Sequence, residues 1–157
     1  MAKVVPFMTP HMATRGAGIS VENPHEGATY PYPLLIALAD QKERLVHDVA
    51  KVIHLHYDEF QGADPGGVGW ALDRQLFSWS VPFHAGAVAY FKSIGVWNDE
   101  HERNNQALIA RQDLLAQAWQ SYLAAPSSSD FKVGWYQARA KALQAQELDP
   151  IWVQPEG

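Results

Sequence analysis

Arg15 is the first residue of this sequence whose surroundings suggest chemistry, because it stands beside Gly16 and Gly18 in the run Thr14-Arg15-Gly16-Ala17-Gly18. A guanidinium group binds carboxylates through two parallel hydrogen bonds, and glycine lets the backbone approach a ligand closely. The run therefore suits a small anion site. A flexible turn with a solvated arginine is the alternative, which the pattern alone favours. It is neither a dinucleotide-binding fingerprint nor a P-loop.

Histidine and acidic residues are concentrated around His54, His56, Asp58 and Glu59, which suggests a metal site at first sight. Residues two apart on a helix point about 200° away from each other, so His54 and His56 cannot share a metal ion there. His84 could act as a base beside an acidic group, but the sequence has no nucleophile elbow. We therefore expect structural or surface histidines, with no metal ligands, catalytic residues or cofactor.

Aromatic residues offer a second kind of candidate. Most of the six tryptophans lie in or beside apolar stripes, where packing is the expected role. Tyr30 and Tyr32 differ, because they flank the start of an expected strand, and the loops next to strands often carry binding groups. Tyr30 and Tyr32 thus join Arg15, Gly16 and Gly18 as candidate ligand-binding residues.

The elements that would position these residues begin with Leu34–Leu38, a short apolar run behind two prolines that predicts a buried strand. Asp40 is a suitable N-cap for a helix over Gln41–Gln61, with Glu43 three residues later. Gly62 can end that helix in a left-handed turn. The apolar side of the predicted helix consists of Leu45, Val46, Val49, Val52, Ile53, His56, Tyr57 and Phe60.

The rest of the chain predicts more helix, about half of all residues. We expect an extended loop over residues 1–29, with a possible short strand at Val4–Phe7, and then a domain over residues 30–125. Residues 126–157 should form a C-terminal helix and tail. The fold class is mainly α with one or two short β-strands. The run from Gly62 to Gly69 predicts a flexible loop. The further helices are expected at Trp70–Phe77, at His84–Ile94 with Gly95 ending it, at Asp99–Ala124 after an Asn98 cap, and at Asp130–Leu148.

Composition limits the possible functions. The chain has 157 residues, 12 basic against 17 acidic, and a net charge of −5, which argues against nucleic acid as a partner. It contains no cysteine, which excludes disulfides, thiolate metal sites and a cysteine nucleophile. No stretch approaches the ~20 apolar residues of a membrane span. The N-terminal residues lack the apolar core of a signal peptide.

Several motifs along the chain are distinctive when taken together. They are Val4-Val5-Pro6-Phe7-Met8-Thr9-Pro10-His11, Ala13-Thr14-Arg15-Gly16-Ala17-Gly18, Tyr30-Pro31-Tyr32-Pro33, Ala39-Asp40-Gln41, Val81-Pro82-Phe83-His84-Ala85-Gly86-Ala87, Tyr90-Phe91-Lys92 and Ile94-Gly95-Val96-Trp97. Over about residues 4–124, these motifs together resemble the C-terminal part of TAXI-type solute-binding proteins of TRAP transporters.

The resemblance implies the C-terminal segment of a type II periplasmic-binding-protein α/β fold. Such proteins are exported and two-lobed, and they close on a small carboxylate-bearing or amino-acid-like solute that passes to a TRAP permease. The resemblance places Arg15, Gly16, Gly18, Tyr30 and Tyr32 near the solute. It implies a periplasmic protein, whereas the chain as written lacks an export signal and most of both lobes, so a cytoplasmic location stays open. We expect a fragment whose apolar faces are covered by a homo-oligomer or by the missing lobe.

Two other functions stay open at this point. The chain can be a helical module for oligomerisation or protein docking that binds no solute. It can also be a metal-dependent enzyme that uses His84 or the region of His54 and His56. Solute binding without catalysis is the hypothesis that the motifs favour.

Overall fold

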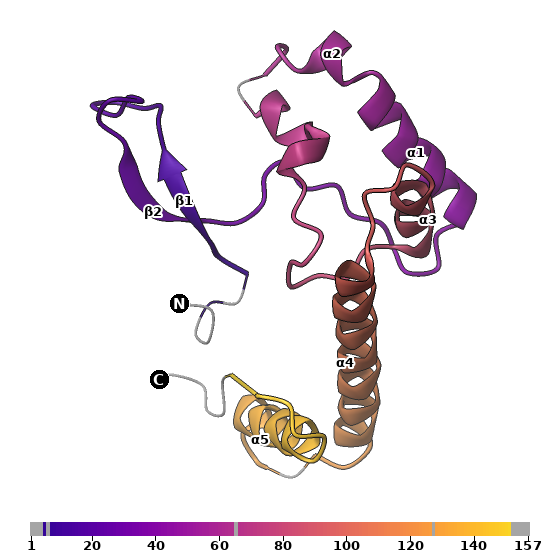
Figure 1. Ribbon diagram of the computed structural model, residues 1–157. Coiled ribbons are helices and arrows are strands. Elements are labelled where there is room, and N and C mark those ends of the chain that lie inside the picture. Colours follow the sequence, from indigo (N-terminus) through magenta and orange to yellow (C-terminus); the bar gives the residue numbers. More distant parts are fainter. Residues whose placement is uncertain (1–4, 6, 65, 127, 152–157) are drawn as a thin grey trace. The chain divides into compact units, whose positions relative to one another are not determined.

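The computed structural model describes residues 5, 7–64, 66–126 and 128–151 of the chain (Figure 1). The protein is mainly helical, at 51% helix, with a two-stranded antiparallel sheet, which confirms the predicted fold class in its coarse form. The chain divides into two compact units, one up to Arg103 and the other from Asn104 onward. The two units are described in turn.

The first unit begins with a β-hairpin where the sequence predicted only extended loop. β1 (Thr9–Ala13) pairs with β2 (His25–Thr29) in a register that runs from Thr9 opposite Thr29 to Ala13 opposite His25. Its strands lack the alternating apolar pattern that normally indicates β-structure, so the loop prediction was wrong here. Val5 and Phe7 are not in a strand, and Val4 and Pro6 lie outside the described residues.

The predicted strand Leu34–Leu38 does not form. These residues take neither helix nor strand, and the side chain of Ile36 keeps 78% of its surface exposed. A buried strand needs a neighbouring strand and a covering layer, and the described residues provide neither for this run. Burial within this structure therefore does not explain why the run Leu34–Leu38 is apolar.

The predicted helix Gln41–Gln61 forms as two shorter helices. α1 (Glu43–Leu55) begins after Lys42, so Asp40 is not its N-cap, and α2 (Tyr57–Phe60) follows a break at His56. At His56 the backbone leaves helical geometry, with φ −106° and ψ 14°. The predicted apolar side of this helix is only partly correct, because three of its residues are exposed: Leu45, Val52 and His56.

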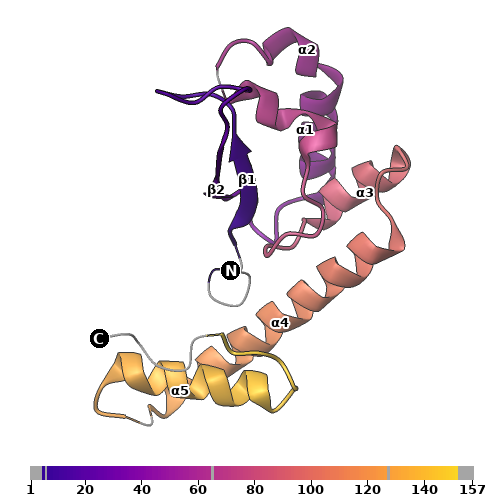
Figure 2. The same cartoon turned by 60° about the vertical axis from the view of Figure 1, so that its left-hand side comes forward.

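Helix α3 (Ala85–Ser93) packs against α1 within the first unit (Figures 1 and 2). Gly86 permits this, because a Cβ atom there would overlap the carbonyl oxygen of Glu43 in α1. His84 caps α3 by accepting a hydrogen bond from the Gly86 N–H at 3.0 Å. Gly95, with φ 74°, follows the end of the helix as predicted.

The core of the first unit consists of four buried residues on and just after α3, namely Val88, Tyr90, Phe91 and Trp97. Phe77 lies between Phe91, at 4.9 Å between ring centroids, and Trp97, at 5.7 Å. The predicted short helix Trp70–Phe77 is replaced by two 3₁₀ turns, η1 (Gly67–Trp70) and η2 (Leu72–Arg74). These turns carry the chain from α2 towards the aromatic core.

Helix α4 (Asp99–Ala124) has the predicted bounds and the predicted cap. The Asn98 side-chain oxygen accepts a hydrogen bond from the His101 N–H at 2.9 Å, which satisfies one of the free donors of the first turn. Glu102 binds Lys92 at 2.9 Å and accepts a hydrogen bond from the indole N–H of Trp97 at 2.8 Å. These contacts join the first turns of α4 to the end of α3.

The second unit pairs the later part of α4 with α5 (Phe131–Gln144), which ends four residues before the predicted Leu148. Asp130 caps α5 by accepting from the Val133 N–H at 3.0 Å. The Tyr122 hydroxyl donates to the Phe131 carbonyl at 2.8 Å, and Trp119 packs on Trp135 with ring centroids 4.7 Å apart. An aromatic cluster therefore forms the contact between the two helices.

Candidate functional site

The structure places Arg15 in the connection that closes the β-hairpin, two residues after β1. Gly16 and Gly18 have φ values of 146° and 76°, a turn that side-chain-bearing residues rarely adopt. Gly16 forms a bridge with Ile19, and the Asn23 side chain donates to the Gly18 carbonyl at 3.1 Å. This turn presents the exposed Arg15 to solvent.

Tyr30 and Tyr32 lie at the other end of the hairpin. Tyr30 follows β2 directly and Tyr32 comes two residues later. Thr29 and His25, at the two ends of β2, are four residues apart, which is about 14 Å along the strand. Arg15 comes two residues after Ala13, the residue that pairs with His25, and so lies past this far end of the hairpin. The structure therefore separates the predicted ligand-binding residues into two groups, one at each end of the hairpin, and one small solute cannot touch both within this chain.

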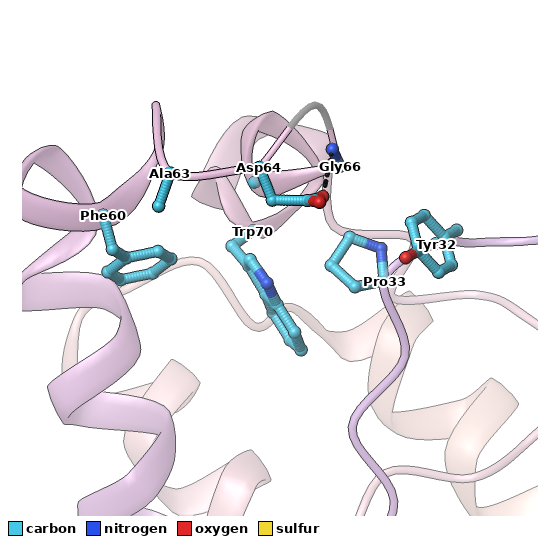
Figure 3. A pocket seen from close by; sticks show the side chains of 8 residues that line it. Tyr32, Pro33, Phe60, Ala63, Asp64, Gly66 and Trp70 are labelled. Carbon is cyan, nitrogen blue, oxygen red and sulfur yellow. Dashed lines mark hydrogen bonds between the residues drawn. The ribbon is translucent and has the colours of Figure 1, made fainter.

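Tyr32 lines a hollow of ≈ 280 Å³ between the segment after the hairpin and the loop after α2 (Figure 3). Figure 3 shows the Trp70 ring between Phe60 on one side and Pro33 on the other. The sequence did not indicate Phe60, Pro33 or Trp70 as site residues. Their common feature is an aromatic or apolar side chain, which the sequence could not distinguish from ordinary packing.

Two glycines allow this hollow to form. A Cβ atom at Gly66 would lie 2.6 Å from a ring carbon of Tyr32, and one at Gly69 would overlap the Tyr32 carbonyl oxygen. The sequence predicted the glycine-rich run from Gly62 to Gly69 as a flexible loop. In the structure its glycines permit the close packing of the loop on Tyr32 and Pro33, so the glycine content is the signal that could have indicated this contact.

The charge of the hollow does not suit a carboxylate. Asp64 is the charged residue in its lining, and its carboxylate accepts a hydrogen bond from the Gly66 N–H at 2.6 Å. No lysine or arginine is among the described residues that line it. A negatively charged solute would meet repulsion here, so this hollow and Arg15 differ in the ligands that they can take.

The histidines considered for chemistry take part in local contacts. His54 Nδ1 lies 2.6 Å from the hydroxyl of Tyr90, and burial raises the pKa of that hydroxyl above its ordinary value. His56 pairs with Glu59 at 2.7 Å, and His84 caps α3. Over the part of the chain that the structure describes, no cluster of three potential metal-ligating side chains is present.

Comparison of the chain with protein-family models, curated proteins and solved structures gave no match. Among the described residues, no helix combines the length and the apolar character needed to cross a membrane.

Proposed function

We propose that this chain serves as the C-terminal portion of a TRAP-type solute-binding protein, in which Arg15 binds the carboxylate of a small solute. The observation that carries the proposal is the position of Arg15 on a glycine turn at the closed end of the hairpin, exposed to solvent. The resemblance of the motifs to TAXI-type proteins supports it. By the same resemblance the complete protein has a type II periplasmic-binding fold, lies in the periplasm and delivers its solute to a permease.

The geometry favours Arg15 over the tyrosines as the group that binds the carboxylate. A guanidinium forms charge-assisted hydrogen bonds with a carboxylate, and the backbone of Gly16 and Gly18 leaves room for the ligand to approach. Tyr32 lines a hollow that contains Asp64. In this proposal Tyr30 and Tyr32 therefore contact an uncharged surface of the missing lobe that the resemblance implies, and not the carboxylate.

Calorimetry with a panel of small organic acids tests this function. We expect one acid to bind, and Arg15→Ala to weaken that binding about tenfold or more, since a hydrogen bond to a charged group contributes about 1.5–3 kcal/mol. Arg44→Ala is the matched control, because the Arg44 side chain is 93% exposed on α1. No heat with any acid, or equal affinity in the Arg15 variant, contradicts the proposal.

A second function, assembly with another protein or another copy, is favoured by the exposed apolar run after the hairpin. Leu34, Leu35, Ile36 and Leu38 keep between 49% and 78% of their surface exposed. Contiguous apolar surface of this kind commonly marks a contact with another protein. Sedimentation velocity over a range of concentrations tests this function. A monomer at every concentration, with no change for an Ile36→Asp variant, counts against self-assembly.

A further inference from the structure

We propose that the first unit contains a separate binding site for an organic ammonium ion, in a second and larger hollow. This hollow has a volume of ≈ 710 Å³. It is lined by residues from the junction of α1 and α2, from the η2 turn and from the start of α4, all within the first unit. Pockets for small ligands commonly measure about 300–1,000 Å³, so the hollow has room for a compact amine.

The charge of the lining favours a cation. Asp58 in α2 and Asp73 in η2 bring two carboxylates to the hollow from different elements, and no lysine or arginine is among the described residues that line it. Asp58 accepts one hydrogen bond, from the Gln61 side chain at 2.9 Å, which leaves further acceptor positions on its carboxylate. His54 and His101 also line the hollow. With no lysine or arginine among the described lining residues, the two carboxylates raise the local concentration of positive ligands.

The uncharged part of the lining suits the body of such a ligand. Tyr57 and Phe77 contribute aromatic rings, and Leu72 contributes an apolar side chain. The face of an aromatic ring attracts a cation. Phe77 is held in place by its neighbours, with His101 at 5.1 Å and Trp97 at 5.7 Å between ring centroids. The ring of Phe77 is therefore positioned by its neighbours without a ligand.

Gln75, another residue of the lining, has an amide group whose nitrogen is held by the backbone. The Gln75 side-chain nitrogen donates to the carbonyls of Gly69 at 3.2 Å and Ala71 at 3.0 Å. These bonds use the amide nitrogen, so within the proposal the amide oxygen is the atom that can accept from an N–H donor. The same lining disfavours a carboxylate, so the proposed site differs from Arg15 in both place and ligand, and it does not depend on the solute-binding function.

Titration of the full chain with benzylammonium, followed by calorimetry and by tryptophan fluorescence, tests the proposal. We expect saturable binding that weakens with added salt, because exposed charges are screened. Uncharged benzyl alcohol, which has the same ring, should bind at least about fivefold more weakly. Benzoate should not compete with benzylammonium.

Variants locate the site. Asp58→Asn and Asp73→Asn should each weaken benzylammonium binding about fivefold, the effect of one exposed ion pair. Both side chains are exposed, so the fold should persist, which thermal unfolding can check. Asp113→Asn, an exposed aspartate of α4 in the second unit, is the matched control and should bind as the parent does.

Three results would overturn the proposal: no binding of benzylammonium at millimolar concentration, equal binding of benzyl alcohol, or unchanged affinity in both aspartate variants. Arg15→Ala should leave benzylammonium binding unchanged. A failure of this inference can thus be told apart from a failure of the carboxylate site, which the organic acids alone report.

Discussion

Two segments of the first unit are rich in apolar side chains, residues 83–97 and residues 34–55, but they differ in how far those side chains are buried. In the first segment, Phe91 and Trp97 are each 8% exposed and lie within the aromatic core. In the second, Ile36 and Leu38 are 78% and 75% exposed, and α1 contains no buried residue among those described. Apolar composition alone therefore did not determine burial.

The difference lies in what each segment packs against. Helix α3 contacts α1 on one side, where Gly86 permits close approach, and its Phe91 contacts Phe77 and Phe83. For Leu34–Leu38 no comparable covering surface is found among the described residues. Burial is a property of two surfaces together, so an apolar segment becomes core only where the remainder of the chain, or another protein, supplies the second surface.

The largest effect that tests this comparison is expected for Phe91→Ala. Removing a buried phenylalanine should lower the free energy of unfolding by about 3–5 kcal/mol, since transfer free energy is lost and a cavity is left. Ile36→Ala is the matched variant in the exposed segment, and it should change the stability by less than about 0.5 kcal/mol. Urea denaturation followed by tryptophan fluorescence measures both.

A similar loss of stability in the Phe91→Ala and Ile36→Ala variants would contradict the difference in burial between the two segments. It would show that Ile36 is covered in solution, either by the chain itself or by a second copy. Repeating the denaturation at several protein concentrations separates these cases, because the stability of an assembly depends on concentration and that of a monomer does not.

A smaller effect is expected at the contact of α1 and α3. Gly86→Ala should destabilise the protein by about 1–3 kcal/mol, because the added methyl group overlaps the Glu43 carbonyl and the helices must separate. Gly62→Ala is the control, since a Cβ atom there meets nothing within 4 Å. Thermal unfolding of both variants measures the difference. Equal melting temperatures would mean that the two helices do not pack closely.

The elements that could be predicted from the sequence are those specified by neighbouring residues. Asn98 before an acidic first turn predicted the start of α4, and the structure shows its capping hydrogen bond. Gly95 predicted the end of α3, and Asp130 predicted the start of α5. Each of these signals acts over about one helical turn, so it does not depend on the arrangement of the rest of the chain.

The features that could not be predicted depend on residues far apart in the sequence. The hairpin pairs Thr9 with Thr29, and neither strand has an apolar alternation. The hollow at Tyr32 requires the glycine loop that begins at Gly62 to fold back on the segment after the hairpin. Arg15 and Tyr32 were grouped as one site because both suit ligand contact, whereas the pairing register separates them. Sequence spacing contains no information about such distances.

The smallest change in stability is expected at the two predicted N-caps, Asn98 and Asp40, where the two segments can be compared again, since Asn98 directly follows residues 83–97. Asn98→Ala should cost about 1 kcal/mol, because the side-chain oxygen that accepts from the His101 N–H is lost. Asp40→Ala should cost less than about 0.5 kcal/mol, because α1 begins after Lys42 and the exposed Asp40 does not cap it. Urea denaturation of both variants gives the two values. A cost for Asp40→Ala as large as that for Asn98→Ala would place Asp40 at the start of α1 in solution, as the capping pattern predicted, and the contrast between the two segments would then be limited to side-chain burial.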